Sequence, residues 1–277
     1  MKARTISLLV FAAIGAACSG YEGGGDVRIA PVADSGTSTI DGGGPSSTSD
    51  ASSPRDGGID AKEPSRSSVI AYYPLNGNVN DQSPATTHLD LTLATASFTS
   101  GQVDQSLAFS NTGQAVVGAS RPKVDDAFAF GDGDFTIQAW IASSGNLGTG
   151  LGTRQFNVTA TDGWMLYADQ SNVVFQSNDP RGTLGASAGV STEFRHVVAR
   201  RKTGTLALFV NGTMMAARDN WPSIGLERAF AIQRSGGLGN SAPRIDEVVI
   251  WSRALDESEI NVNYTRGQNG LAPVLTE

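Results

Sequence analysis

The acidic side chains that could support glycosidase-type chemistry are poorly placed for it. Such catalysis uses two carboxyl groups that project from one face, one as the general acid and the other as the base or nucleophile. Asp132 and Asp134 lie in a glycine-containing turn, and Asp246 is adjacent to Glu247, so these last two should face opposite sides of a strand. The sequence therefore predicts a protein that is not an enzyme. A glycan-active enzyme with an unrecognised site is the weaker alternative.

The two histidines and the single cysteine form no recognisable nucleophilic or metal site. His88 is expected at a loop edge and His196 in a strand, and neither has a partner in a known motif. We expect structural roles for both histidines. Cys18 is the only cysteine, so no disulfide can form within the chain.

The N-terminus is typical of an exported protein. Lys2 and Arg4 precede an apolar run, residues 6–17, which is too short to span a membrane and suits a signal-peptide core. The small residues before Cys18 resemble a bacterial lipoprotein lipobox, although Gly15 replaces the usual aliphatic residue. We expect cleavage after residue 17 and acylation of Cys18 with a diacylglycerol and a further chain such as palmitate. The alternative is an ordinary secretory signal that leaves Cys18 as a free thiol.

This interpretation predicts a lipid-anchored protein of the bacterial cell envelope. Ser19, in place of an aspartate, favours the outer membrane and leaves open whether the protein faces the periplasm or the cell surface. Residues 18–67 are mostly Gly, Ser, Asp, Thr, Pro and Ala, a composition that indicates a flexible tether with a reach of about 40 Å. The formal net charge of −7 argues against a nucleic-acid partner. Contact with the membrane is expected through the lipid anchor alone.

From residue 69 onward the chain is a series of short apolar runs separated by turns, which predicts an all-β fold. The run 134–141 alternates cleanly, and Asn211-Gly212 between two apolar runs is the strongest hairpin signal. We expect around a dozen strands in a two-sheet antiparallel sandwich of the jelly-roll type. The expected strands are 69–75, 89–93, 106–109, 115–117, 134–141, 155–159, 163–168, 172–176, 196–201, 206–210, 213–217, 229–233 and 245–251.

The last of these runs also predicts a strand followed by a helix. Ile245, Val249 and Trp251 are expected on one strand face, with Asp246 on the other. Asp256 and Glu259 have the spacing of a capping box, so a short helix should begin there and continue through residue 264.

Four motifs, in this order, resemble the laminin-G-like domains of the concanavalin A-like lectin/glucanase superfamily. They are residues 73–78 with Asp81, residues 134–140, residues 209–212, and residues 245–255. The resemblance predicts a domain over residues 68–268, followed by a tail, 269–277. It implies a β-sandwich with a concave sheet.

The resemblance also implies a structural calcium ion where the first loop meets the last strand. Asp81 and Asp246 are the candidate metal ligands, because Ca²⁺ prefers hard oxygen ligands. The alternative is that Asp246 accepts hydrogen bonds from the backbone of residues 78–81 instead of binding metal.

Two hypotheses for the function follow. The first is a carbohydrate-binding or adhesive module, because loops near the sheets contain aromatic and polar residues that could bind sugars. These candidate ligand-binding residues are Trp164, Tyr167, Arg154, Asn157 and Trp221. The second is a scaffold that binds another envelope or extracellular protein and has no sugar site. For each tryptophan, a place in the core is the alternative to a place in the site.

Overall fold

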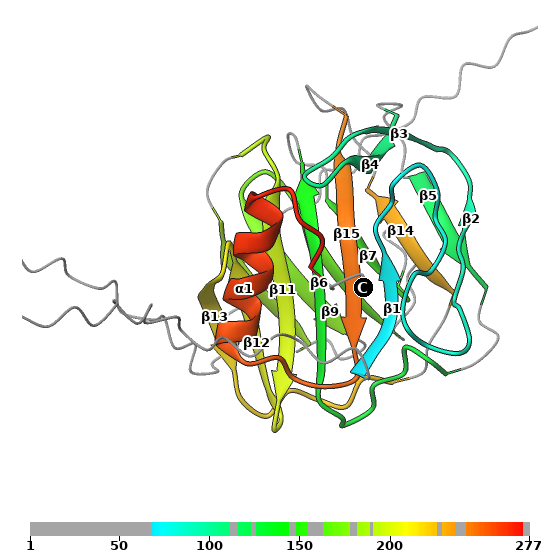
Figure 1. The fold of residues 1–277 in the computed structure, drawn as a ribbon. Helices are drawn as coiled ribbons and strands as arrows, with labels where there is room; N and C mark the ends of the chain where they lie inside the picture. The colour runs from blue at the N-terminus through cyan, green and yellow to red at the C-terminus, as the bar shows by residue number, and fades with distance from the viewer. Residues whose placement is uncertain are drawn as a thin grey trace, which may run out of the picture.

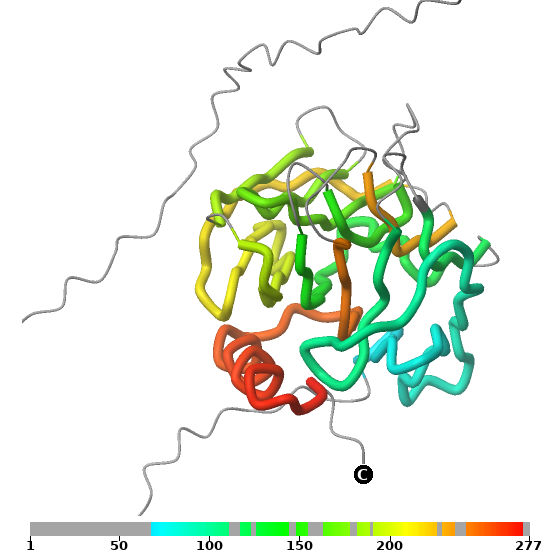
Figure 2. The backbone as a smooth tube through the Cα atoms, turned by 90° about the horizontal axis from the view of Figure 1, so that it is seen from above, coloured from blue at the N-terminus to red at the C-terminus, as the bar shows by residue number. Residues whose placement is uncertain are grey.

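The protein is a sandwich of two antiparallel β-sheets with one helix on the outside, as the computed structural model shows (Figures 1 and 2). This confirms the predicted fold class. The structure describes residues 68–110, 116–122, 126–143, 148–154, 163–177, 182–188, 191–225, 229–235 and 242–273. The expected signal peptide, the tether and the expected strand 155–159 lie outside these ranges. In the described part of the chain, no helix combines the length and apolar character needed to cross a membrane.

The eight-stranded sheet has the order β13-β12-β11-β6-β15-β4-β3, and β1 also pairs with β15. Its strands are β1 (Val69–Tyr73), β3 (Ala96–Ser100), β4 (Gln105–Phe109), β6 (Phe135–Ala142), β11 (Arg195–Lys202), β12 (Thr205–Val210), β13 (Thr213–Arg218) and β15 (Arg244–Trp251). The turn between β12 and β13 is the predicted one, since Asn211 and Gly212 have φ values of 50° and 78°.

The seven-stranded sheet has the order β10-β9-β8-β7-β14-β5-β2. Its strands are β2 (Thr92–Leu93), β5 (Val116–Arg121), β7 (Thr149–Gly152), β8 (Trp164–Ala168), β9 (Asn172–Ser177), β10 (Thr183–Ser187) and β14 (Phe230–Arg234). The described residues form fifteen strands, of which β3, β7 and β10 were not predicted, and the expected strand 89–93 is reduced to β2.

The main core lies between the two sheets and follows the predicted alternation. Phe135, Ile137, Ala139 and Ile141 of β6 point into it, and all are fully buried. Trp164 contributes a ring from the opposite sheet. Burying such side chains stabilises the fold by roughly 25 cal/mol per Å² of apolar surface removed from water.

Strand β15 departs from the prediction because it contains a β-bulge. Its pairing with β6 shifts register between Asp246 and Val249, and Glu247 has a positive φ of 50°. The extra residue moves Val248 into the main core. Asp246 therefore lies on the same face as Val249 and Trp251, not opposite to them as expected.

The helix α1 (Glu257–Gln268) covers the outer face of the eight-stranded sheet (Figures 1 and 2). It begins with the predicted capping box and runs beyond residue 264. Ile260 packs with Val249 and Trp251 in a second apolar cluster, and Asn263 Nδ2 donates a hydrogen bond of 3.0 Å to Gln138 Oε1.

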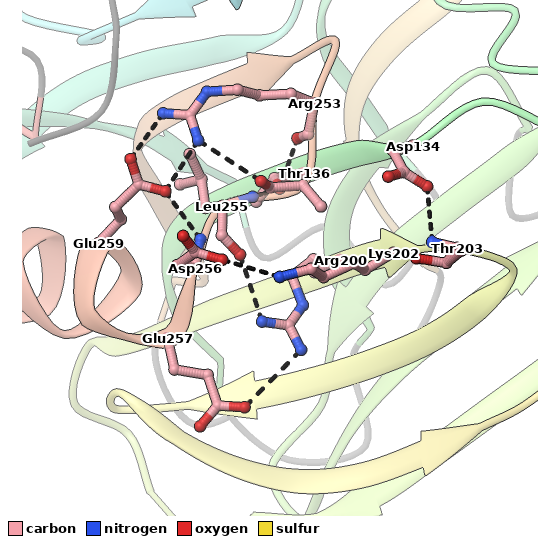
Figure 3. A network of polar contacts seen from close by, with 11 residues as sticks. Asp134, Thr136, Arg200, Lys202, Thr203, Arg253, Leu255, Asp256, Glu257 and Glu259 are labelled. Carbon is pink, nitrogen blue, oxygen red and sulfur yellow. Dashed lines mark hydrogen bonds and ion pairs between the residues drawn. The ribbon is translucent and has the colours of Figure 1, made fainter. Parts of the chain in front are cut away.

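A polar network holds the segment between β15 and α1 (Figure 3). Both terminal nitrogens of Arg253 contact the carboxylate of Glu259 at 2.8 Å. Thr136 Oγ1 donates to the Arg253 carbonyl and accepts the Leu255 N–H, each at 2.9 Å. The exposed pair Lys202–Asp256 closes the network at 2.8 Å.

Candidate functional site

The outer face of the seven-stranded sheet carries a half-buried tyrosine on β8, a strand between β9 and β7. Tyr167 alternates with Leu166 and Ala168, which point into the core, so its side chain lies on the outer face. Its cross-strand neighbours on that face are Val174 of β9 and Gly150 of β7. Gly150 lets the two strands approach closely here, because a Cβ atom at this position would lie 2.6 Å from the Cβ atom of Tyr167.

Polar groups stand on both sides of Tyr167 along the strands. Asp169 follows β8 on the same face, and Arg154 follows β7 at the opposite end of the pairing. Burial raises the pKa of Tyr167; the Asp169 carboxylate adds to the rise, and the Arg154 guanidinium opposes it. The tyrosine hydroxyl therefore lies within the electrostatic reach of an anion and a cation.

The backbones that carry these two charged groups are fixed by hydrogen bonds. Asp169 Oδ1 accepts the N–H groups of Ser171 and Asn172 at 2.8 and 2.7 Å, and Asp169 Oδ2 accepts none among the described residues. The Arg154 carbonyl accepts Gln233 Nε2 at 2.6 Å, and the Arg154 N–H donates to the Trp164 carbonyl at 3.0 Å. Within the described residues the Arg154 guanidinium has no hydrogen-bond or ion-pair partner. In the described part of the chain, an acceptor oxygen of Asp169 and the donor groups of Arg154 thus lie near Tyr167 without a bonded partner of their own.

We name this group, Arg154, Tyr167 and Asp169, the tyrosine site. It contains two of the five predicted ligand-binding residues. Trp164 and Trp221 are 0% and 2% exposed and pack in the core, so neither indole can stack on a sugar, and that expectation is corrected. Asn157 lies outside the described residues.

The sequence contains the signal that separates these residues. Trp164, Leu166 and Ala168 alternate with Met165 and Tyr167, which places Trp164 on the apolar face of its strand. Nearness to a loop, the criterion used for Trp164, does not distinguish the two faces. Continuing the same alternation by one step would have added Asp169, which the sequence analysis missed.

The acidic residues considered for catalysis have structural contacts instead. Asp134 Oδ1 accepts the Thr203 N–H at 2.8 Å, and Asp132 lies 3.5 Å from Arg201. Asp246 and Glu247 are both fully buried in the β15 bulge, so they face the interior of the protein and not solvent.

The histidines also lie away from the tyrosine site. His88 is exposed in a loop. His196 is fully buried beneath α1, with its ring 5.2 Å from Trp140 and 6.0 Å from Tyr264, measured between ring centroids. Burial lowers the pKa of His196 to about 3, so the ring is neutral at pH 7.

The two predicted calcium ligands, Asp81 and Asp246, accept hydrogen bonds from backbone amides. Asp81 accepts the N–H groups of Tyr72, Ser83 and Leu89 at 2.8–2.9 Å. Asp246 accepts those of Gln102, Val103 and Glu247 at 2.8–2.9 Å. Asp246 was expected to accept hydrogen bonds from the backbone of residues 78–81 if it did not bind metal. The backbone donors come instead from the 101–105 loop and from Glu247. Among the described residues, no three His, Cys, Asp or Glu side chains are grouped to hold a metal ion.

Solved structures with a similar fold include toxin binding domains. The binding domain of Paraclostridial Mosquitocidal Protein 1 aligns with a TM-score of 0.58 and 17% identity, over 72% of this chain and 52% of that one. The binding domain of botulinum neurotoxin serotype D aligns with a TM-score of 0.56 and 15% identity, over 72% and 51%. This chain spans about half the length of those structures, and the likeness concerns the fold alone.

The family model described as the concanavalin A-like lectin/glucanases superfamily, of the laminin G type, matches residues 120–261. No curated protein matches the sequence. The matched range covers more than half of the chain, and it includes β6, the hairpin β12–β13 and the motif of β15 that carried the resemblance. The chain therefore belongs to the concanavalin A-like lectin/glucanase superfamily.

Proposed function

We propose that this protein is a non-catalytic carbohydrate-binding module with its sugar site at the tyrosine site. The observation that carries the proposal is the position of Tyr167 between Asp169, whose Oδ2 accepts no hydrogen bond from the described residues, and Arg154. A sugar presents an apolar C–H face, which suits an aromatic ring, and hydroxyl groups that both donate and accept hydrogen bonds. The tyrosine site supplies a matching partner for each feature.

Two further points support a binding role. The acidic residues considered for catalysis in the described ranges make structural contacts, and none of them belongs to the tyrosine site. Among the solved structures with this fold, that of botulinum neurotoxin type C is described as interacting with two ganglioside molecules, which carry sugars.

We further propose that Cys18 anchors the module by lipid to the bacterial envelope, at the outer membrane.

Glycan-array binding of the purified chain, followed by calorimetry on a positive glycan, tests this function. We expect Tyr167→Ala and Asp169→Asn to weaken binding at least about tenfold, because the loss of about 1.4 kcal/mol of contact has that effect on Kd. Tyr167→Phe should retain most of the affinity, because it keeps the ring that stacks on the apolar face of the sugar.

Asp219→Asn is the matched control. It changes an exposed carboxylate in the turn after β13, on the other sheet, and should bind like the parent. A stable protein that ignores every glycan would refute the sugar site and favour a protein partner. Turnover of a polysaccharide panel would refute the non-catalytic role.

A further inference from the structure

The calcium ion implied by the resemblance would need several free oxygen ligands at one point. Ca²⁺ takes six to eight oxygens at about 2.3–2.6 Å in proteins. Asp81 and Asp246 would have to contribute together, with backbone carbonyl groups completing the shell. The fit can be judged from what each carboxylate oxygen already contacts.

Around Asp81, backbone N–H groups occupy the places a cation would take. Oδ1 accepts Tyr72 at 2.9 Å and Ser83 at 2.8 Å, and Oδ2 accepts Leu89 at 2.8 Å. Three of the roughly four lone-pair sites of the carboxylate are used in this way. The donor hydrogens carry positive partial charge, so they repel a cation placed among them.

One carbonyl group of this first loop and one of the adjoining strand β1 are occupied as well. The Val79 carbonyl accepts the Leu91 N–H at 3.1 Å, and the Tyr72 carbonyl accepts the Gln82 N–H at 2.7 Å. The loop is thus closed by its own backbone, and Asp81 joins its two sides to β1.

Around Asp246 the arrangement is equivalent. Oδ2 accepts Gln102 at 2.8 Å and Val103 at 2.9 Å, and Oδ1 accepts Glu247 at 2.9 Å. The 101–105 loop approaches so closely that a Cβ atom on Gly101 would lie 2.5 Å from Asp246 Oδ2. Glycine at this position lets the loop backbone take the space beside the carboxylate.

We infer that Asp81 and Asp246 are carboxylate clasps that fix two loops to the β1–β15 pair through backbone amides, and that the domain needs no calcium at either position. Asp81 anchors the 79–91 loop and Asp246 anchors the 101–105 loop. Each clasp accepts three backbone N–H groups, and such hydrogen bonds are stronger to an ionised carboxylate than to a neutral acceptor. The inference is independent of the sugar site, which lies on the other sheet.

Thermal unfolding of the full chain, with millimolar Ca²⁺ and with chelator, tests the inference directly. Extracellular calcium modules have Kd values of about 10⁻⁴–10⁻³ M, so the upper part of the millimolar range fills most of such a site. We expect the same Tm in both conditions, because no native-state ligand is lost. A saturable rise of Tm with Ca²⁺ that Asp81→Asn or Asp246→Asn abolishes would overturn the inference.

The variants separate a clasp from a metal ligand. Asp81→Asn places an amide group against backbone N–H donors, so we expect Tm to fall by about 4–8 °C, equally with and without Ca²⁺. Asp90→Asn is the matched control, since exposed Asp90 in the same loop accepts one backbone N–H from Asp81 at 2.9 Å and should lower Tm much less. A calcium effect that persists in both clasp variants would place the ion elsewhere and leave the clasps as described.

Discussion

Glu247 is fully buried, and one of its two carboxyl oxygens has no hydrogen-bond partner among the described residues. The Tyr72 hydroxyl donates to Oε2 at 2.7 Å, and Oε1 has no partner among the described residues. Burial, and next the neighbouring Asp246 carboxyl group, raise the pKa of Glu247 to about 9. Burial also raises the pKa of Asp246 to about 7, against the effect of its three backbone amides. Glu247 is therefore protonated in the folded protein at pH 7.

This pKa predicts a loss of stability in alkaline solution. Between pH 4.5 and 9 the folded chain holds a proton that the unfolded chain has released, so the free energy of unfolding falls as pH rises through this window. Glu247→Gln removes this titrating group. Between pH 7 and 9, above the pKa of Asp246, we therefore expect the free energy of unfolding of the variant to fall less steeply with pH, by up to about 1.4 kcal/mol per pH unit. Urea unfolding across this range measures the slope. An unchanged slope would mean that Glu247 ionises normally in the folded state.

His196 predicts the opposite dependence on the acid side. Its folded pKa of about 3 lies below the unfolded value of 6.5, so only the unfolded chain gains a proton as pH falls between them, and stability is lost. Among the described residues neither ring nitrogen has a hydrogen-bond partner. We expect His196→Leu to reduce the slope between pH 6.5 and 4 and to leave stability at pH 7 unchanged or higher by up to about 1 kcal/mol. His88→Gln, at an exposed position, is the control and should keep the parental slope.

At the scale of elements, the connection from β15 to α1 contains a buried ion pair, Arg253–Glu259, among its polar contacts (Figure 3). Arg253 is 26% exposed and Glu259 is fully buried, so removing the arginine leaves a buried carboxylate without its cation. We expect Arg253→Ala to lower the free energy of unfolding by about 3 kcal/mol. Chemical denaturation measures the loss, and hydrogen exchange should show it concentrated in α1.

The matched control for this prediction is Lys202→Ala. It removes the pair Lys202–Asp256, whose side chains are about half exposed, and pairs of this kind contribute at most about 1 kcal/mol. Equal losses in the two variants would contradict a special role for the buried pair.

Strands with a strong internal alternation could be predicted from the sequence. β6 is the clearest example, because one of its faces packs in the core and the other lies beneath α1. β3, β7 and β10 were missed because small and polar residues dominate them, and their pairing comes from neighbouring strands. The bulge in β15 was missed for a related reason: a bulge is defined by the register with the partner strand, which alternation within one strand does not contain.

The candidate site was predicted only in part for the same physical reason. Tyr167 and Arg154 were selected by their nearness to loops, which placed the buried Trp164 beside them as an equal candidate. One face of β8 packs against the second sheet and the other faces outward. The sequence indicates which is which only through the alternation of residues along the strand. Asp169 enters the site by that pattern and by the turn that fixes its carboxylate.

At the scale of the whole molecule, the two outer faces differ in what covers them. The helix α1 closes the eight-stranded sheet over Trp140 and Trp251, whereas the seven-stranded sheet carries the half-buried Tyr167. In the proposed function, the eight-stranded sheet supports the helix and the seven-stranded sheet binds the ligand. A ligand at the tyrosine site would therefore leave the packing of α1 unchanged.

The proposed anchor and the proposed site can therefore be separated by a single substitution. Several acyl chains at Cys18 would give durable membrane attachment, at about 0.8 kcal/mol for each buried methylene group. We expect Cys18→Ala to abolish incorporation of labelled palmitate and to leave the precursor uncut, measured in a bacterial host by labelling and membrane fractionation. The purified variant should bind glycans as the parent does, because the tyrosine site belongs to the folded sandwich. Palmitate incorporation that continues in Cys18→Ala would refute the lipoprotein prediction and leave the sugar site standing.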